Sequence, residues 1–164
     1  VLGTIIPGIY EINHAASALF TNIIGGPGMN SLLNLGLRER RGLVYTVEAS
    51  TTLYRDTGMW SIYFGCDRQD TEKCIAEINR IISSATEKDL SDKKLAQYKR
   101  QITGQMTVAR DNREAAIMSM ARATLYHGHA LTLEESAEKI MAVTIDDLRS
   151  LSSHLLNLSE LTFC

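Results

Sequence analysis

A two-residue period across residues 44–66 is the feature that most limits the folds open to this chain. One side of the segment 44–54 carries Val44, Thr46, Glu48, Ser50, Thr52 and Tyr54, and the other carries Tyr45, Val47, Ala49, Thr51 and Leu53. β-Branched and aromatic residues in this alternation predict a strand with one side more apolar than the other. The turn sequence Arg55-Asp56-Thr57-Gly58 follows, and the segment 59–66 then places Trp60, Ile62, Phe64 and Cys66 on one face. The segment therefore predicts a β-hairpin that needs a cover on one side.

Helical spacing dominates the rest of the chain. A helix with apolar residues from Ala15 to Ile24 ends at the run Gly25-Gly26-Pro27-Gly28, and a second is expected over residues 29–40. Three arginines and Gly42 are typical of that second helix's end. After the hairpin, the stripe Cys74, Ile75, Ile78, Ile81 and Ile82 predicts another helix. Four more are expected between residues 91 and 155, with inward faces rich in Ala, Met and Leu, and strands are expected over residues 1–4 and 158–163.

This order of elements predicts an α+β fold, an antiparallel sheet with helices packed on one face plus a helical subdomain. The 164 residues suit a single domain, and a start at Val1 rather than Met suggests a fragment of a longer chain. With 17 basic and 19 acidic residues, charge gives no case for a nucleic acid or an anionic membrane as partner. No stretch approaches the roughly 20 apolar residues of a membrane span. Three cysteines cannot all pair internally, which favours a reducing compartment such as the cytoplasm.

Common catalytic signatures are missing from the sequence. A zinc site on a helix needs two imidazoles about one turn apart, whereas His127 and His129 are two residues apart and diverge on a helix. The run 25–28 follows a helix and precedes Met-Asn-Ser, so it does not fit a phosphate-binding loop, and a nucleotide-binding domain is a minor alternative. Cys66 has no histidine partner in evidence.

Two adjoining motifs are more specific. Residues 23–34 read Ile-Ile-Gly-Gly-Pro-Gly-Met-Asn-Ser-Leu-Leu-Asn, and residues 37–45 read Leu-Arg-Glu-Arg-Arg-Gly-Leu-Val-Tyr. Together they resemble the second, C-terminal half of the paired repeats in the M16 family of zinc metallopeptidases, which includes pitrilysin, insulin-degrading enzyme and the mitochondrial processing peptidase. The hairpin, the helical region and residues 142–148 fit the same pattern, so the resemblance covers nearly the whole chain.

The resemblance implies that the two halves of the protein have different roles. In this family a His-x-x-Glu-His motif in the N-terminal half holds the zinc, and its glutamate is the general base. The second half closes over the site and contributes an arginine and a tyrosine that contact the substrate near the scissile bond. By motif these are Arg38 and Tyr45, our expected substrate-binding residues. The chain itself lacks the zinc motif, so the resemblance implies no catalytic residue, metal ligand or cofactor in this segment, and zinc in a partner half.

Alternatives remain open for both residues and for the function. Arg38 could be only a solvated cation at a helix end, and strand parity groups Tyr45 with Val47, which favours burial of the ring. The leading hypothesis is a substrate-binding part of an M16 peptidase that hydrolyses peptides. The alternative is a structural or interaction module, as in inactive members such as the core subunits of the respiratory cytochrome bc complex. A zinc-bearing half-domain, in the same chain or a partner subunit, and self-association through an open sheet edge are the expected partnerships.

Overall fold

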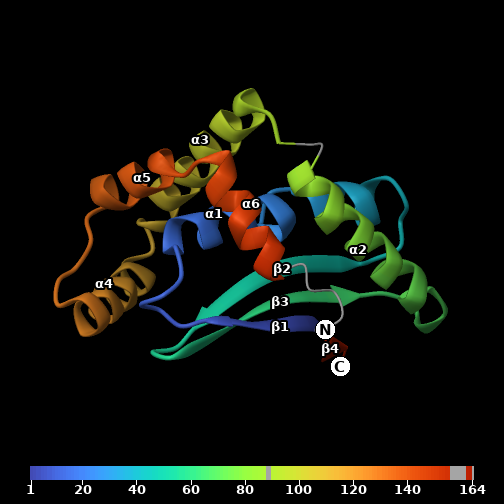
Figure 1. The fold of residues 1–164 in the computed structure, drawn as a ribbon, viewed down its shortest axis with the longest axis horizontal. Helices are drawn as coiled ribbons and strands as arrows, with labels where there is room; N and C mark the ends of the chain where they lie inside the picture. The colour runs from blue at the N-terminus through green and yellow to red at the C-terminus, as the bar shows by residue number, and fades with distance from the viewer. Residues whose placement is uncertain (88–89, 156–161, 164) are drawn as a thin grey trace.

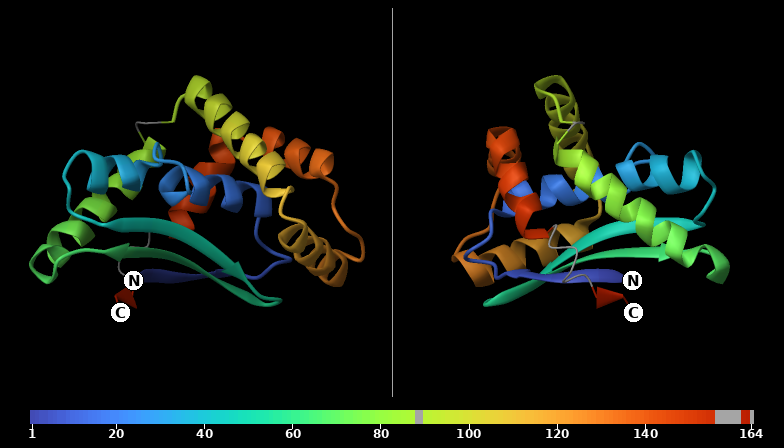
Figure 2. Two further views of the ribbon diagram at one scale, coloured as in Figure 1. Left: turned by 180° about the vertical axis from the view of Figure 1, so that it is seen from behind. Right: turned by 45° about the vertical axis from the view of Figure 1, so that its right-hand side comes forward.

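Four antiparallel strands form one sheet in the computed structural model, which describes residues 1–87, 90–155 and 162–163. The strands are β1 (Leu2–Pro7), β2 (Thr46–Leu53), β3 (Thr57–Gly65) and β4 (Thr162–Phe163), in the order β2-β3-β1-β4. The helices lie on one side of this sheet (Figures 1 and 2). The predicted fold class is therefore confirmed, and β2 is one edge of the sheet.

The helical elements follow the predicted order with local differences. They are α1 (His14–Gly25), η1 (Asn34–Glu39), η2 (Arg68–Asp70), α2 (Thr71–Glu87), α3 (Asp92–Ala109), α4 (Arg113–His127), α5 (Leu133–Ala142) and α6 (Ile145–Leu155). Side chains of Asn13, Ser91, Asn112 and Thr132 cap α1, α3, α4 and α5, each accepting a backbone N–H three residues on. The expected closing strand over 158–163 is observed at Thr162–Phe163, and its residues 158–161 lie outside the described residues.

The core lies between the sheet and the helices. Trp60 of β3 is fully buried beside Phe20 of α1, with ring centroids 6.1 Å apart, and its indole N–H donates to the Thr21 hydroxyl at 3.1 Å. Burial of these large apolar side chains is the main stabilising contribution to the domain. The opposite face of the sheet is open, and Ile5 is 81% exposed there.

Two helical expectations are wrong. The apolar residues of α4 do not face inward, because Ile117, Met118 and Leu125 are all exposed and α4 has no buried residue among those described. Figure 1 shows why: α4 lies at one end of the molecule, away from the sheet's covered face. The second helix also begins later than expected, since residues 29–31 form a turn, and its last part, η1, is a π-helix rather than an α-helix.

Candidate functional site

Arg38 lies in the π-helical segment η1, directly before the chain turns into the hairpin. The N–H of Arg40 donates to the carbonyl of Leu35, five residues back, which is the wide turn of a π-helix. Gly42 then adopts a left-handed conformation, with φ of 60°, that favours glycine. The Arg38 side chain is exposed, and no hydrogen bond or ion pair joins its guanidinium to another residue in the described part of the chain.

Arg38 also lines a cavity of about 260 Å³ at the start of β2, the edge strand of the sheet. We call it the β2-edge cavity. Its lining residues come from the glycine-rich turn, from η1 and the turn before it, and from the start of β2: Gly25, Gly26, Pro27, Met29, Asn34, Arg38, Thr46, Val47, Glu48 and Ala49. Segments that are separate in the sequence thus form one recess with an arginine at its wall.

The glycine-rich turn forms one wall because it approaches β2 very closely. A Cβ added to Gly25 would lie 2.5 Å from the backbone nitrogen of Ala49, so a larger residue would displace the strand or the helix end. Two amide side chains of α3 hold the turn. Gln101 exchanges hydrogen bonds with Asn30 at 2.6 and 3.1 Å, and Gln105 accepts one from Asn22 at 2.7 Å. The turn is therefore a structural wall of the cavity.

Tyr45 precedes β2 and projects outward. The register opposes Thr46 to Gly65, yet the N–H of Tyr45 also donates to the Gly65 carbonyl at 2.8 Å. Two residues of one strand thus face one residue of the other, which is the arrangement of a β-bulge. The parity argument that favoured burial of Tyr45 with Val47 is wrong for this reason, since the bulge interrupts the alternation and Tyr45 is 70% exposed.

The phenol of Tyr45 donates a hydrogen bond to the carboxylate of Asp67 at 2.6 Å. This bond, with the negative charge of Asp67, raises the pKa of Tyr45 and keeps the phenol a proton donor. Arg38 and Tyr45 are therefore both accessible at the start of β2. Arg38 lines the β2-edge cavity, whereas Tyr45 stands one residue from the lining residue Thr46 and is turned toward Asp67.

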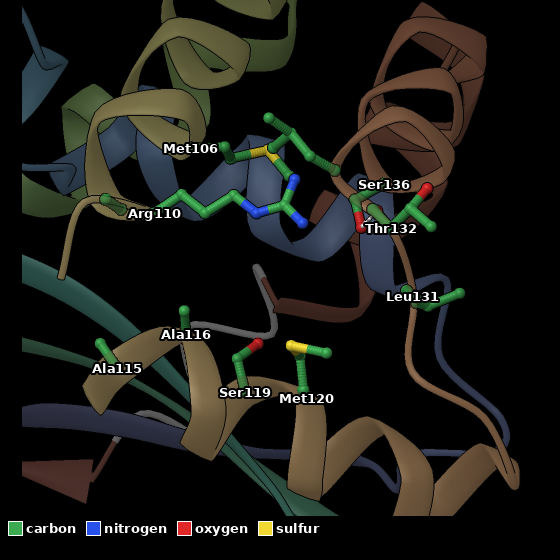
Figure 3. Close-up of a pocket in the computed structure, with 11 residues that line it drawn as sticks. Met106, Arg110, Ala115, Ala116, Ser119, Met120, Leu131, Thr132 and Ser136 are labelled. Atoms are coloured by element: carbon green, nitrogen blue, oxygen red, sulfur yellow. Dashed lines mark hydrogen bonds between the residues drawn. The ribbon is translucent and has the colours of Figure 1, made fainter. Parts of the chain in front are cut away.

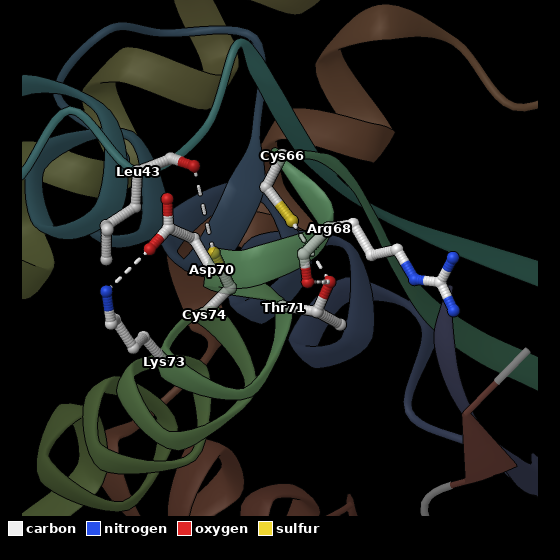
Figure 4. A network of polar contacts seen from close by, with 7 residues as sticks. All are labelled: Leu43, Cys66, Arg68, Asp70, Thr71, Lys73 and Cys74. Atoms are coloured by element: carbon white, nitrogen blue, oxygen red, sulfur yellow. Dashed lines mark hydrogen bonds and ion pairs between the residues drawn. The ribbon is translucent and has the colours of Figure 1, made fainter.

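The cysteines next to this region do not make a nucleophilic site. Figure 4 shows Cys66 and Cys74 where β3 passes into α2, with the Cys74 thiol directed at the Leu43 carbonyl, 3.8 Å away. Burial, followed by the hydrogen bond with Cys66, raises the pKa of Cys74 to about 11. Because the thiolate is the reactive form, Cys74 is a poor nucleophile at neutral pH.

A second cavity, of about 240 Å³, lies where α3, α4 and α5 approach one another. Figure 3 shows Met106 and Arg110 on one side, Met120 of α4 on another and Ser136 of α5 on the third. The described residues that line it include no cluster of convergent acid, base or metal-binding groups.

The described residues contain no group of three His, Cys, Asp or Glu side chains placed to hold a metal ion. His14 and His127 are near one another, with ring centroids 5.8 Å apart, but they are only a pair. Among the described helices, none combines the length and apolar character needed to cross a membrane.

Comparison with known proteins decides the family. The sequence model described as "Peptidase M16 inactive domain" matches residues 2–102. The chain belongs to the M16 peptidase family. An uncharacterized zinc protease of Streptomyces coelicolor is 25% identical to this M16 chain over 141 residues, covering 86% of the chain and 30% of that protein. One from Bacillus subtilis is 25% identical over 137 residues, covering 84% and 33%.

Solved structures share the fold. A peptidase M16 inactive domain from Pseudomonas fluorescens aligns with a TM-score of 0.76 at 21% identity, over 98% of this chain and 38% of that one. A protease from Helicobacter pylori aligns with a TM-score of 0.81 at 15% identity, over 98% and 38%. The M16 chain thus spans about a third of the length of the curated relatives it matches. It carries the domain of the family that is described as inactive.

Several residues of the site were not predicted from the sequence. Met29 and Glu48 line the β2-edge cavity, and Asp67 binds the phenol of Tyr45. The motif itself contained a partial signal, because the glycine run and the arginine are joined by only a short helix. What the motif could not show is that both fold back onto the same strand edge.

Proposed function

We propose that this M16 domain binds extended peptide substrates for a zinc-bearing half-domain, located in the same chain or in a partner subunit, which hydrolyses them. The observation that carries the proposal is the exposed residue Arg38, which lines a cavity and whose guanidinium has no partner in the described part of the chain. An arginine left unpaired beside a recess is available for a ligand's carbonyl or carboxylate oxygen.

Arg38 and Tyr45 would act as hydrogen-bond donors to the peptide. A guanidinium and a phenol can both stabilise a carbonyl oxygen that gains negative charge during attack by water. Tyr45 must release Asp67 to do so, and because its pKa is raised it retains its proton at neutral pH. The donor set of the described residues does not fit zinc, which catalyses hydrolysis by activating water, so we place the metal in the other half-domain.

The test uses Arg38→Ala and Tyr45→Phe in the longer protein that carries both half-domains. Each variant should lower kcat/KM for peptide hydrolysis about 10- to 100-fold, because a charge-assisted hydrogen bond contributes about 1.5–3 kcal/mol. The matched controls are Arg40→Ala, an exposed arginine outside the cavity lining, and Tyr54→Phe, a tyrosine that is 56% exposed on the hairpin. Both controls should keep their activity.

Unchanged kcat/KM in both site variants, in a protein that does cleave peptides, would remove the two residue assignments. Absence of peptidase activity in the longer protein would instead favour the alternative, a structural or interaction module. We also propose that the isolated chain self-associates, because Ile5 on the open face of the sheet and Ile117 and Leu125 on α4 are large apolar side chains exposed to solvent.

A further inference from the structure

Two cysteines meet at the corner where β3 passes into α2 (Figure 4). Cys66 directly follows the last residue of β3, and Cys74 lies in the first turn of α2. Thr71 and Cys74 are three residues apart, so their side chains occupy the same face of the helix. Sγ of Cys66 lies 3.7 Å from Oγ1 of Thr71, and the thiols of Cys66 and Cys74 form a hydrogen bond with each other. The two sulfur atoms are therefore neighbours, although residues 67–73 separate them in the sequence.

The two thiols differ in their access to solvent. Cys66 is partly exposed, whereas Cys74 is fully buried. An oxidant in solution therefore reaches Cys66, and Cys74 is accessible only to a group that already lies beside it. Both thiols are also held weakly, because sulfur is a poor hydrogen-bond partner and Sγ of Cys74 lies 3.8 Å from the Leu43 carbonyl oxygen. Among the described residues, neither sulfur belongs to a cluster that could hold a metal ion.

We infer that Cys66 and Cys74 form an oxidation site, at which a peroxide converts the dithiol to an intramolecular disulfide. This is a site of stoichiometric oxidation, not of catalysis, and it is independent of the proposed peptide-binding function. The new bond would close the segment 67–73, which includes η2 and Asp67, the partner of the Tyr45 phenol. The site therefore adjoins the proposed hydrogen-bond donors without including them.

The conversion takes place in two steps. In the first, the Cys66 thiolate attacks one peroxide oxygen, so that the S–O bond forms, the O–O bond breaks and the leaving oxygen takes up a proton. With hydrogen peroxide, this step yields Cys66 sulfenic acid and one water. In the second, the Cys74 sulfur attacks the sulfenic sulfur; the S–S bond forms, the S–O bond breaks, and hydroxide leaves with the Cys74 thiol proton as a second water. The two thiols together lose two electrons, which reduce the peroxide.

Proximity of the two sulfurs favours the disulfide over further oxidation. A sulfenic acid with no thiol nearby reacts with more peroxide and becomes sulfinic acid, which is generally irreversible. Here Cys74 already lies beside the reacting sulfur, and a group held in position reacts at a high effective concentration. Because burial raises the pKa of Cys74 to about 11, its thiolate is scarce at neutral pH and Cys74 does not compete for the peroxide itself. Cys66 is therefore oxidised first and Cys74 second.

Peptide mapping of the longer protein tests the inference. The reduced protein is treated with an equimolar amount of hydrogen peroxide, the remaining thiols are alkylated, and a tryptic digest is analysed by mass spectrometry without reduction. Trypsin cuts after basic residues, so the disulfide should appear as residues 56–68 linked to residues 74–80. Dithiothreitol should remove this linked pair.

Three variants separate the two steps. Cys66→Ser should abolish the linked pair and leave Cys74 unoxidised. Cys74→Ala should also abolish the linked pair but leave Cys66 as sulfenic acid, so trapping of Cys66 by dimedone should rise about tenfold or more over the parent protein. Cys164→Ser is the matched control, because Cys164 is the third cysteine of the chain, and it should leave the linked pair unchanged.

The measurements can also contradict the inference. It is overturned if Cys66 is oxidised to sulfinic or sulfonic acid while Cys74 remains a thiol, or if Cys66 is found linked to Cys164 or to a second molecule. It is equally overturned if both cysteines stay reduced under conditions that oxidise free cysteine.

Discussion

Glu77 connects the segment that carries Arg38 to α2 through an ion pair. Its carboxylate is almost fully buried in α2 and accepts hydrogen bonds from Arg80 at 2.5 and 3.0 Å. It also forms an ion pair at 3.1 Å with Arg41, just beyond η1. We expect Glu77→Gln to destabilise the chain, because the substitution keeps the shape of the side chain and removes the charge that all three contacts use.

The magnitude follows from the geometry. A hydrogen bond to a charged group contributes about 1.5–3 kcal/mol and a neutral one about 0.5–1.5 kcal/mol, so three contacts give an upper limit of about 4.5 kcal/mol for loss of the charge. The two arginines are 53% and 60% exposed and regain water when the pair is broken, which reduces the expected loss to about 1–2 kcal/mol. For a chain of this length, the melting temperature should fall by about 2–8 °C.

The pH dependence supplies the sharper test. Hydrogen bonds from Arg80, helped by its charge and that of Arg41, lower the pKa of Glu77 in the folded state. A carboxyl with a lowered pKa stabilises the fold above its unfolded pKa, near 4.5, and that stability is lost as pH falls through the folded value. The difference in unfolding free energy between the parent chain and Glu77→Gln should therefore have its full size at pH 7 and become smaller below about pH 4.

Urea unfolding followed by circular dichroism at several pH values measures this difference. Asp146→Asn is the control, because its ion pair with Arg149 at 3.1 Å is exposed on both sides and should contribute less than about 0.5 kcal/mol. An equal stability of Glu77→Gln and the parent chain at pH 7, or a difference that does not narrow in acid, would refute the reasoning.

Two further predictions concern packing and association. Gly36→Ala should lower the free energy of unfolding in urea by about 1–2 kcal/mol, because the new Cβ would overlap Cδ1 of the buried Ile81. Ile81→Val removes that atom, so the double variant should regain most of the lost stability. If the losses of the two single variants simply add, the clash is not the cause. In sedimentation equilibrium the isolated chain should form dimers or larger species, and replacing Ile117 and Leu125 together by Ser should weaken them. A monomer at high concentration would contradict self-association.

The sequence predicted the fold correctly where a periodic pattern of apolar residues marked the boundary between core and solvent. The alternation that puts Trp60 and Ile62 on one face identified the buried side of the hairpin. The isoleucine stripe of α2 identified the inner face of that helix. The prediction failed for α4. Its residues Ile117 and Met118 are apolar enough for a core, but sequence pattern cannot tell burial within one domain from an apolar surface left exposed.

The candidate site could be predicted from the sequence only in part. The motif drew attention to Arg38 and Tyr45, yet the parity rule placed the tyrosine inside. A bulge adds one residue to one strand, and that insertion depends on hydrogen bonds to Gly65 across the sheet, which no local pattern encodes. The cavity beside Arg38 could not be predicted from the sequence either, because it depends on the close approach of Gly25, at a helix end, to Ala49 in β2.

Three departures from regular backbone lie within one short segment: the π-helical turn of η1, the left-handed Gly42 and the bulge at Tyr45. The π-helical turn and the bulge are each less favourable than the regular alternative, and the left-handed turn between them needs the glycine at position 42, so their succession needs a cause. A continuous α-helix would rotate the side chains at the end of η1, and a strand without the bulge would turn Tyr45 toward the core with Val47. The irregular path instead leaves both donors in solvent at the open end of an unpaired strand edge. The proposed peptide-binding role accounts for this arrangement, because it uses the two exposed side-chain donors at the start of β2.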